Sequence, residues 1–166
     1  MVLLVEVKMS QKYPMTPGCF ERLKQELLHL KKVERPKISQ EIGTARELGD
    51  LKENAEYHAA KERQGMIEAR IKDLEIKVGL AEVIDPSKLS GDRVVFGATV
   101  VLTDLQNDEE VHYQIVGDDE ADLKAHKISI SSPIARALIG RVQGDEAHVH
   151  SPKGVRDYEI SKVSFV

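Results

Sequence analysis

Two long apolar patterns that meet at a Gly-Asp pair constrain the fold of this chain more than any other feature of its sequence. Before Gly49 and Asp50, apolar residues recur at steps of three to five residues, and after them the steps alternate between four and three, as in a coiled-coil seam. Glycine readily ends a helix, and aspartate readily begins one. We therefore predict an antiparallel helical hairpin that reverses at this pair. The stripe residues are Leu23, Leu27, Leu30, Val33, Ile38, Ile42 and Ala45, then Ile67, Ile71, Leu74, Val78 and Ala81.

The first helix of the hairpin has clear start and interruption signals. Thr16 followed by Pro17 is a favourable N-cap and first helical residue, and the pattern continues to about Leu48. Pro36 lacks a backbone donor, so we expect a kink just before it, near residues 33–35. Roughly 30 helical residues would make an arm of about 45 Å, which suggests that the hairpin projects far enough to reach into a partner. Periodicity alone leaves a dimerising coiled coil equally open.

Two carboxylates at the reversal, Asp50 and Glu53, have two possible roles. Spaced three residues apart, they could form a capping box at the start of the second helix. They could also be oxygen ligands for a hard cation such as Mg²⁺, which often takes only one or two protein carboxylates. The spacing by itself favours the cap.

The second half of the chain changes to a period typical of strands. Residues 82–91 contain Pro86 and Gly91 and are predicted to be a linker, and residues 92–166 are predicted to form a small domain. Within it, Ser132 is expected to cap a short helix over residues 133–138 that ends near Gly140. An antiparallel sheet carrying one helix is the expected architecture. The expected strands are residues 94–96, 98–104, 111–116, 147–150 and 155–163.

Composition and charge exclude several classes of function. No apolar run approaches the roughly 18 residues of a membrane span, and the first residues lack the features of a signal peptide, so we expect a cytoplasmic protein with no membrane partner. Residues 16–81 hold 13 Lys and Arg against 12 Asp and Glu, whereas residues 82–166 hold 9 against 15. This balance argues against a general duplex-DNA binder. We expect Cys19 to be a small thiol buried in the core. We expect His148 and His150 to lie on the solvent-exposed face of a strand.

The tip sequence resembles a known family. The string GDLKENAEYHAAKE, residues 49–62, is similar to the coiled-coil tip of GreA-type transcript cleavage factors of bacterial RNA polymerase. The segments VIDPSK, VVFGATV, YQIVGDDEAD, ISISSPIARALIG and YEISKV also resemble that family, so the likeness runs from Met15 to the end. It departs at the first eight residues, which have no counterpart, and at Lys61, where the family often has arginine. Residues 1–15 are treated as an extension and lead-in, in which residues 2–7 could add an edge strand.

The resemblance implies a fold and a function. The fold is α+β, with a coiled-coil hairpin over residues 16–81 and a C-terminal sheet similar to FK506-binding prolyl isomerases. The implied function is a transcription elongation factor whose tip enters the secondary channel of RNA polymerase and stimulates cleavage of the displaced RNA 3′ end in backtracked complexes. Such a factor is not an enzyme by itself, because the polymerase supplies the rest of a two-metal site.

The resemblance also assigns roles to residues at the tip and in the second domain. Asp50 and Glu53 would hold an Mg²⁺ ion shared with the polymerase and not bound stably by the free protein, with Asn54 and Tyr57 supporting the tip. Arg46 and Lys61, on opposite helices, would meet RNA phosphate. Docking on the polymerase would use the segment Ser132, Pro133, Ile134 and Ala135.

Three alternative functions are retained or weighed. A channel-binding inhibitor of the same architecture would not cut RNA, and a plain coiled-coil adaptor would have no polymerase role. Prolyl isomerisation is disfavoured because it needs an aromatic-lined pocket. The second domain has no Trp, and we expect several of its aromatic residues, Phe96, Tyr113, Tyr158 and Phe165, to serve the core.

Overall fold

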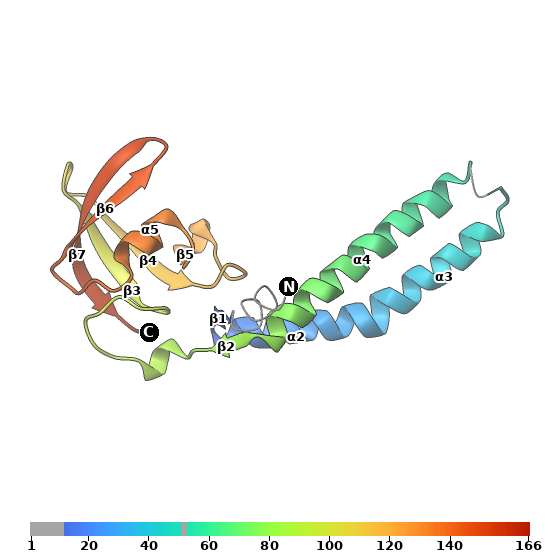
Figure 1. Ribbon diagram of the computed structural model, residues 1–166, viewed down its shortest axis with the longest axis horizontal. Coiled ribbons are helices and arrows are strands. Elements are labelled where there is room, and N and C mark those ends of the chain that lie inside the picture. The colour runs from blue at the N-terminus through green and yellow to red at the C-terminus, as the bar shows by residue number, and fades with distance from the viewer. Residues whose placement is uncertain (1–11, 51–52) are drawn as a thin grey trace, which may run out of the picture. The chain divides into compact units, whose positions relative to one another are not determined.

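The structure is a computed structural model that describes residues 12–50 and 53–166, grouped into two units. One unit is the helical region of residues 20–81, and the other combines residues 12–19 with residues 82–166. Figure 1 shows the helices of the first unit and the sheet of the second. The possible edge strand over residues 2–7 lies outside the described residues. Among the residues described, no helix combines the length and the apolar character needed to cross a membrane.

The predicted antiparallel hairpin is confirmed. One side comprises α2 (Pro17–His29), the π-helical turn η1 (Leu30–Glu34) and α3 (Arg35–Arg46), and the other side is α4 (Ala55–Gly79). Figure 1 shows α3 and α4 running side by side to the turn that joins them. Apolar residues on the facing sides of these helices are buried, as the stripe pattern predicts. They are Leu23, Ile38, Ile42 and Ala45, with Ile71 and Leu74 from α4. Ala60, which the predicted stripe did not include, is also buried.

The interruption predicted at Pro36 takes the form of a π turn. Because Pro36 has no N–H, the helix widens just before it, and Arg35 donates to the carbonyl of Leu30, five residues back. The extra residue in this turn brings Ile38 onto the seam but leaves Val33 outside, 46% exposed. The prediction that Val33 belongs to the buried stripe is therefore wrong. Helix α3 also ends at Arg46 rather than near Leu48.

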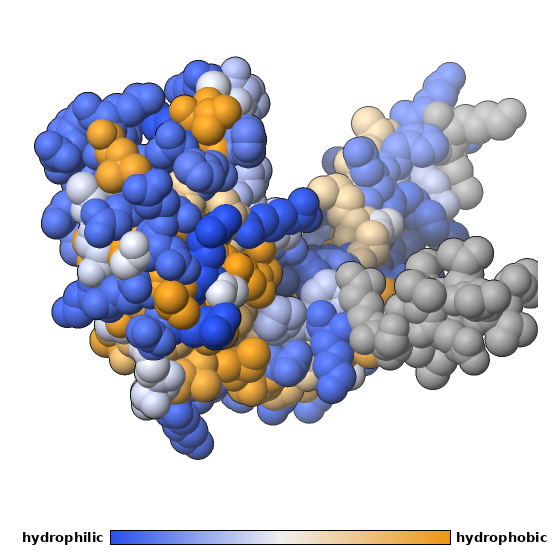
Figure 2. All heavy atoms as spheres, turned by 60° about the vertical axis from the view of Figure 1, so that its left-hand side comes forward, coloured by the Kyte–Doolittle hydropathy of each residue, from blue (hydrophilic) through white to orange (hydrophobic). Residues whose placement is uncertain are grey.

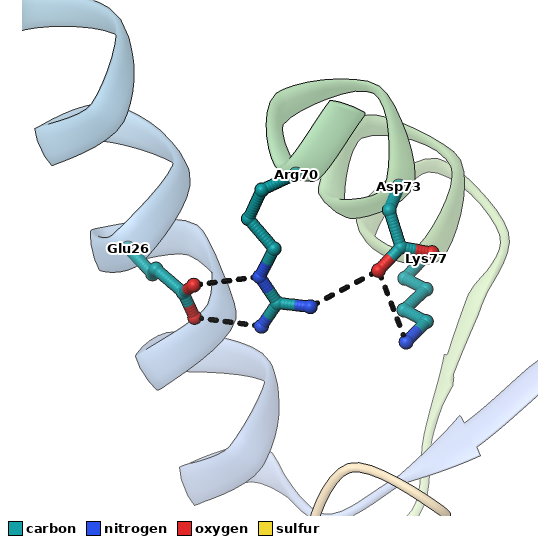
Figure 3. Close-up of polar contacts among 4 residues, drawn as sticks. All are labelled: Glu26, Arg70, Asp73 and Lys77. Carbon is teal, nitrogen blue, oxygen red and sulfur yellow. Dashed lines mark hydrogen bonds and ion pairs between the residues drawn. The ribbon is translucent and has the colours of Figure 1, made fainter. Parts of the chain in front are cut away.

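Ion pairs link the two sides of the hairpin beside its narrow apolar seam. The guanidinium of Arg70 on α4 contacts both carboxylate oxygens of Glu26 on α2, at 2.7 and 3.0 Å. Asp73 accepts from Arg70 at 3.0 Å and lies 3.3 Å from the Lys77 ammonium, as Figure 3 shows. The hydrogen bond from Arg70 lowers the pKa of Glu26, although burial opposes it. Further pairs across the hairpin are Arg35–Glu68, Lys31–Glu75 and Arg63–Glu41.

The second unit contains a five-stranded sheet with the strand order β5-β4-β3-β7-β6. Strand β5 runs parallel to β4, because a connection through the short helix η3 (Leu123–Ala125) carries the chain back before it pairs. This strand has only three residues, too few for a periodic pattern, and the expected antiparallel pairing is wrong at this one edge. The other described pairings of this sheet are antiparallel. The strands are β3 (Thr99–Asp104), β4 (Glu110–Val116), β5 (Lys127–Ser129), β6 (Glu146–Ser151) and β7 (Gly154–Ser164).

Helix α5 (Pro133–Leu138) packs against this sheet and completes its core. Ser132 caps α5 as predicted, since its hydroxyl accepts from the N–H of Ala135 at 3.2 Å. Leu102, Ile115 and Ile160 from the strands and Leu138 from α5 are among the fully buried residues of this core. The expected strand at residues 94–96 is instead a loop, with Val94 and Phe96 buried and Val95 exposed, that turns at Gly97, where φ is +87°. Figure 2 shows mostly hydrophilic side chains on the face it displays, with apolar residues in separate patches.

The predicted linker at residues 82–91 is partly structured. Strand β2 (Ala81–Val83) pairs with β1 (Tyr13–Met15) in a separate two-stranded sheet, so Ala81 is not the last helical residue as predicted. Pro86 begins the short helix η2 (Pro86–Lys88) and is buried. A side chain at Gly97 would lie 2.9 Å from the Pro86 ring, so this glycine lets the segment pack closely.

We expect Glu26→Gln to destabilise the hairpin at neutral pH by about 1 kcal/mol or less, because the pair with Arg70 is partly exposed. The folded-state pKa of Glu26 is lowered, so its ionic contribution is present above the ordinary glutamate pKa of about 4.3 and is lost as the pH falls through the lowered value. The difference between the variant and the wild type should therefore shrink in acid. Thermal unfolding followed by circular dichroism across this pH range measures it.

Glu62→Gln, on the exposed surface of α4, is the matched control and should show no such pH dependence. A loss of stability in Glu26→Gln that stays the same from neutral to acidic pH would contradict an ionic role for this pair.

Candidate functional site: the hairpin tip

The turn that joins α3 to α4 places the predicted acidic pair just before the second helix. Gly49 has φ +129°, a positive value that glycine adopts readily, but it lies three residues after Arg46, where α3 ends. The prediction that Gly49 directly ends the first helix is therefore wrong. Helix α4 begins only at Ala55. Asp50 and Glu53 therefore both lie in the connection between the helices and not in the first helical turn of α4. Both side chains are exposed.

Asn54, not Asp50, caps α4. Its side-chain oxygen accepts from the N–H of Tyr57 at 3.0 Å, and its amide group donates to the carbonyl of Ala45 at 2.5 Å. One side chain thus satisfies a donor at the start of α4 and an acceptor in the last turn of α3. The prediction that Asp50 caps the second helix is wrong, because four more residues are needed to complete the turn.

Asp50 and Glu53 line the same open hollow at the tip, about 440 Å³ in volume, together with Leu48, Asn54 and Glu56. Since Asn54 provides the cap, capping of α4 does not account for the two acids. Both carboxylates lie close to the N-terminal end of α4, whose helix dipole attracts negative charge. The tip therefore presents carboxylate oxygens to solvent around one hollow.

The donor set at this hollow fits a hard divalent cation that has other ligands elsewhere. Carboxylate oxygens are the ligands that Mg²⁺ prefers, and it often takes only one or two from a protein. Within residues 12–50 and 53–166, no group of three or more His, Cys, Asp or Glu is arranged to hold a metal ion. Asp50 and Glu53 could thus supply part of a coordination shell.

Tyr57 connects the tip to the hairpin seam. It is half-buried and packs against the cluster of Ile38, Ile42 and Ala60. The guanidinium carbon of Arg46 lies 5.8 Å from the centre of its ring, a cation–π distance. The aromatic ring therefore holds Arg46 beside the turn.

Lys61, the other predicted RNA-contacting cation, is exposed on α4 and donates to Gln64 at 3.2 Å. Arg46 is the last residue of α3. The two cations thus come from opposite helices, as the sequence indicates. Of the tip residues, Glu56 and the cap at Asn54 were missed by sequence reasoning. An Asn just before an Ala-Glu helix start was the available signal for the cap.

The predicted docking segment lies at the start of α5. Pro133 is exposed, Ile134 is half-buried and Ala135 is fully buried in the core. Ser132 is also half-buried, so any contact by this segment falls to Ser132, Pro133 and Ile134. The preceding loop is held by Asp118, whose carboxylate accepts from the hydroxyl of Ser131 at 2.7 Å.

The remaining candidate residues lie either in a hydrophobic core or on the exposed surface of a strand. Cys19 and Phe96 are buried, and Tyr113, Tyr158 and Phe165 pack against the sheet core, as expected. Burial raises the pKa of Tyr158. His148 and His150 are exposed on β6, and His148 lies 2.5 Å from the carboxylate of Asp157 on the paired strand. These residues form no second candidate site.

Family models match almost the whole of this sequence. Residues 13–83 match the N-terminal domain of transcription elongation factors, and residues 89–165 match the C-terminal domain of GreA/GreB. The chain belongs to the GreA/GreB family of transcription elongation factors. The family resemblance, the α+β fold and the role in transcription elongation that the sequence predicts are thereby confirmed.

Individual GreA relatives align with the chain over nearly its full length. It is 58% identical to transcription elongation factor GreA of Psychrobacter cryohalolentis, over 93% of this chain and 99% of the relative. It is 60% identical to GreA of Brucella anthropi, over 94% of this chain and 99% of the relative. Among solved structures, GreA factor homolog 1 of Thermus thermophilus matches with a TM-score of 0.43 and 28% identity, over 92% and 99% of the two chains.

We expect Asn54→Ala to destabilise the hairpin by about 1–2 kcal/mol, because it removes the cap of α4 and leaves the Ala45 carbonyl without this donor. Asn54→Asp keeps the capping oxygen and removes only the donor, so it should cost less. Urea unfolding followed by helical circular dichroism measures both. If Asn54→Ala were as stable as the wild type while Asp50→Ala were destabilised, Asp50 would be the cap after all.

Proposed function

We propose that this GreA-family factor inserts its hairpin tip into the secondary channel of bacterial RNA polymerase and stimulates cleavage of the RNA 3′ end in backtracked complexes. The observation that supports this function is the pair of exposed carboxylates, Asp50 and Glu53, at a tip where Asn54 already provides the helix cap. Exposed carboxylates at the end of a long hairpin are placed to contact a partner. The alignment of GreA relatives with 93–94% of this chain supports this proposal.

Asp50 and Glu53 would hold one Mg²⁺ ion together with ligands from the polymerase. When bound there, the ion would stabilise negative charge at the phosphodiester and lower the pKa of a bound water. The carboxylates would orient that water through their remaining oxygen lone pairs. Two exposed ligands give the free factor too few donors for stable binding, so activity would require the polymerase.

The surrounding tip residues would position the acids and the RNA. Asn54 ties the start of α4 to the end of α3, and Tyr57 anchors the turn on the seam. Arg46, held over the Tyr57 ring, would contact RNA phosphate from one side, and Lys61 from α4 would do so from the other. In the second unit, Pro133 and Ile134 would contact the rim of the channel.

The double variant Asp50→Asn with Glu53→Gln tests the acidic pair directly. It keeps the size of both side chains and removes both charges, so RNA cleavage in stalled, backtracked complexes should fall by roughly two or more orders of magnitude. Polymerase binding and thermal stability should hold, because neither residue caps α4. RNA products resolved on a gel, together with a binding titration, measure both outcomes.

Glu56→Gln is the matched control, since Glu56 lines the same hollow but lies within α4. Its cleavage activity should stay within about threefold of the wild type. Cleavage near the wild-type rate in the double variant would remove Asp50 and Glu53 from the mechanism. A wild-type factor that binds polymerase and blocks RNA synthesis without cleavage would instead indicate a channel-binding inhibitor.

Arg46→Ala and Lys61→Ala should weaken engagement with backtracked complexes more than with complexes that lack extruded RNA, because phosphate contacts form only with the former. Each loss should diminish as the salt concentration rises. Competition binding at two salt concentrations measures the difference. Equal losses on both kinds of complex would assign these cations to the polymerase or to the hairpin itself.

A further inference from the structure

The hydroxyl of Thr16 makes two hydrogen bonds at the start of α2. It accepts from the N–H of Cys19 at 3.3 Å, which confirms Thr16 as the helix cap, and it donates to the carboxylate of Glu120 at 2.7 Å. Thr16 is only 9% exposed, and the Glu120 side chain is 15% exposed. A charge-assisted hydrogen bond with little access to water is among the stronger polar contacts. The cap of α2 is thus tied to a loop 104 residues further along the chain.

Close packing around this contact holds both partners in place. A side chain at Gly117 would come 2.5 Å from the carbonyl oxygen of Pro14, so only glycine allows β1 to approach the loop this closely. The Lys127 ammonium lies 3.5 Å from the second oxygen of Glu120. Glu120 is therefore fixed from two sides, and Thr16 contacts a preorganised acceptor.

The same loop also holds the segment that leads to α5. Its turn is closed by a hydrogen bond from the N–H of Glu120 to the carbonyl of Gly117 at 3.1 Å. Asp118, within this turn, accepts from the hydroxyls of Ser129 and Ser131, and Ser132 then caps α5. Residues 117–120 thus contact the first turn of α2 and also fix the loop that carries Pro133.

We propose that Glu120 is a positioning residue that couples polymerase docking at α5 to delivery of the tip acids by the hairpin. The proposal rests on the proposed function. Docking at α5 would restrict the motion of residues 117–120, because Asp118 is hydrogen-bonded to Ser129 and Ser131. Through its hydrogen bond to Thr16, Glu120 would then restrict the motion of the first turn of α2. Glu120 contacts neither RNA nor metal in this scheme, and it acts through the cap of the helix that leads into the hairpin.

Three variants separate the hydrogen bond between Thr16 and Glu120 from the capping of α2 by Thr16. Glu120→Ala removes the acceptor but leaves Thr16 able to cap α2, Thr16→Val removes both hydrogen bonds, and Thr16→Ser retains both. Glu109→Ala, an exposed glutamate in the loop between β3 and β4, is the matched control. Cleavage of backtracked RNA is titrated with each factor, which yields a half-saturating concentration and a maximal rate.

For Glu120→Ala we expect a half-saturating concentration within about twofold of the wild type and a maximal rate about tenfold lower, the size expected for loss of one charge-assisted hydrogen bond. Thr16→Val should lose at least as much, whereas Thr16→Ser and Glu109→Ala should match the wild type. A general loss of folding would lower the concentration of active factor and would therefore raise the half-saturating concentration.

A second measurement does not depend on cleavage. Cys19 is the chain's single cysteine, and it is buried one turn from Thr16, so its reaction with a thiol reagent reports opening of this turn. Glu120→Ala and Thr16→Val should increase its labelling rate about tenfold, and Glu109→Ala should not. Addition of polymerase should slow labelling in the wild type more than in Glu120→Ala.

An unchanged maximal rate in Glu120→Ala, or a loss confined to the half-saturating concentration, would overturn the coupling. Equal labelling rates of Cys19 in Glu120→Ala and the wild type would also overturn it. A wild-type factor that stimulates no cleavage would count against the proposed function alone, because the labelling comparison still decides whether Glu120 holds the start of α2.

Discussion

A pair of antiparallel helices can bury apolar side chains only along the single seam between them, and the other features of the hairpin follow from this limit. Near the tip the buried cluster is small, consisting of Ile38, Ile42 and Ala60 with Tyr57 and Ile67 packed beside it. Polar contacts must then help to hold the two sides together. The forked pair of Arg70 with Glu26 does so beside the seam, and Asn54 does so at the turn.

The π turn is a consequence of the same limit. A proline inside a helix would normally direct the following residues away from the seam, and burial would be lost beyond it. The wider turn over Leu30–Glu34 absorbs one extra residue, so Ile38 and Ile42 return to the buried side. The hairpin loses little buried apolar surface at the π turn, because none of the residues of the turn is fully buried.

Sequence reasoning identified the elements that depend on long patterns. It failed where two local conformations, or two neighbouring residues, fit the same pattern equally well. The five-residue step from Val33 to Ile38 was visible, but a kink and a π turn both explain such a step, and only backbone geometry distinguishes them. Asp50 and Asn54 are both good N-caps, and the choice of Asn54 depends on its second hydrogen bond to Ala45, across the turn. Strand β5 has three residues, too few for a periodic signal.

The candidate site was predictable in identity but not in geometry. The residue types at the tip and their resemblance to one family identified Asp50 and Glu53. The hollow that they share, and the capping of α4 by Asn54, became visible only in the folded turn. A site that a partner completes leaves little trace in the free protein, because its acids face solvent.

On the proposed function, the exposure of the tip acids is a requirement and not a defect. Carboxylates enclosed with further ligands would bind a cation in the free factor, and the completed shell would leave fewer positions for RNA and for polymerase ligands. Two acids on a narrow turn bind weakly alone and gain affinity only where other ligands converge on the same ion. Rigidity of the turn then matters more than its charge, because a displacement of about 1 Å at a reacting centre can cost about a hundredfold in rate. Asn54 and Tyr57 supply that rigidity through backbone and ring contacts, and both leave the carboxylates open to the partner.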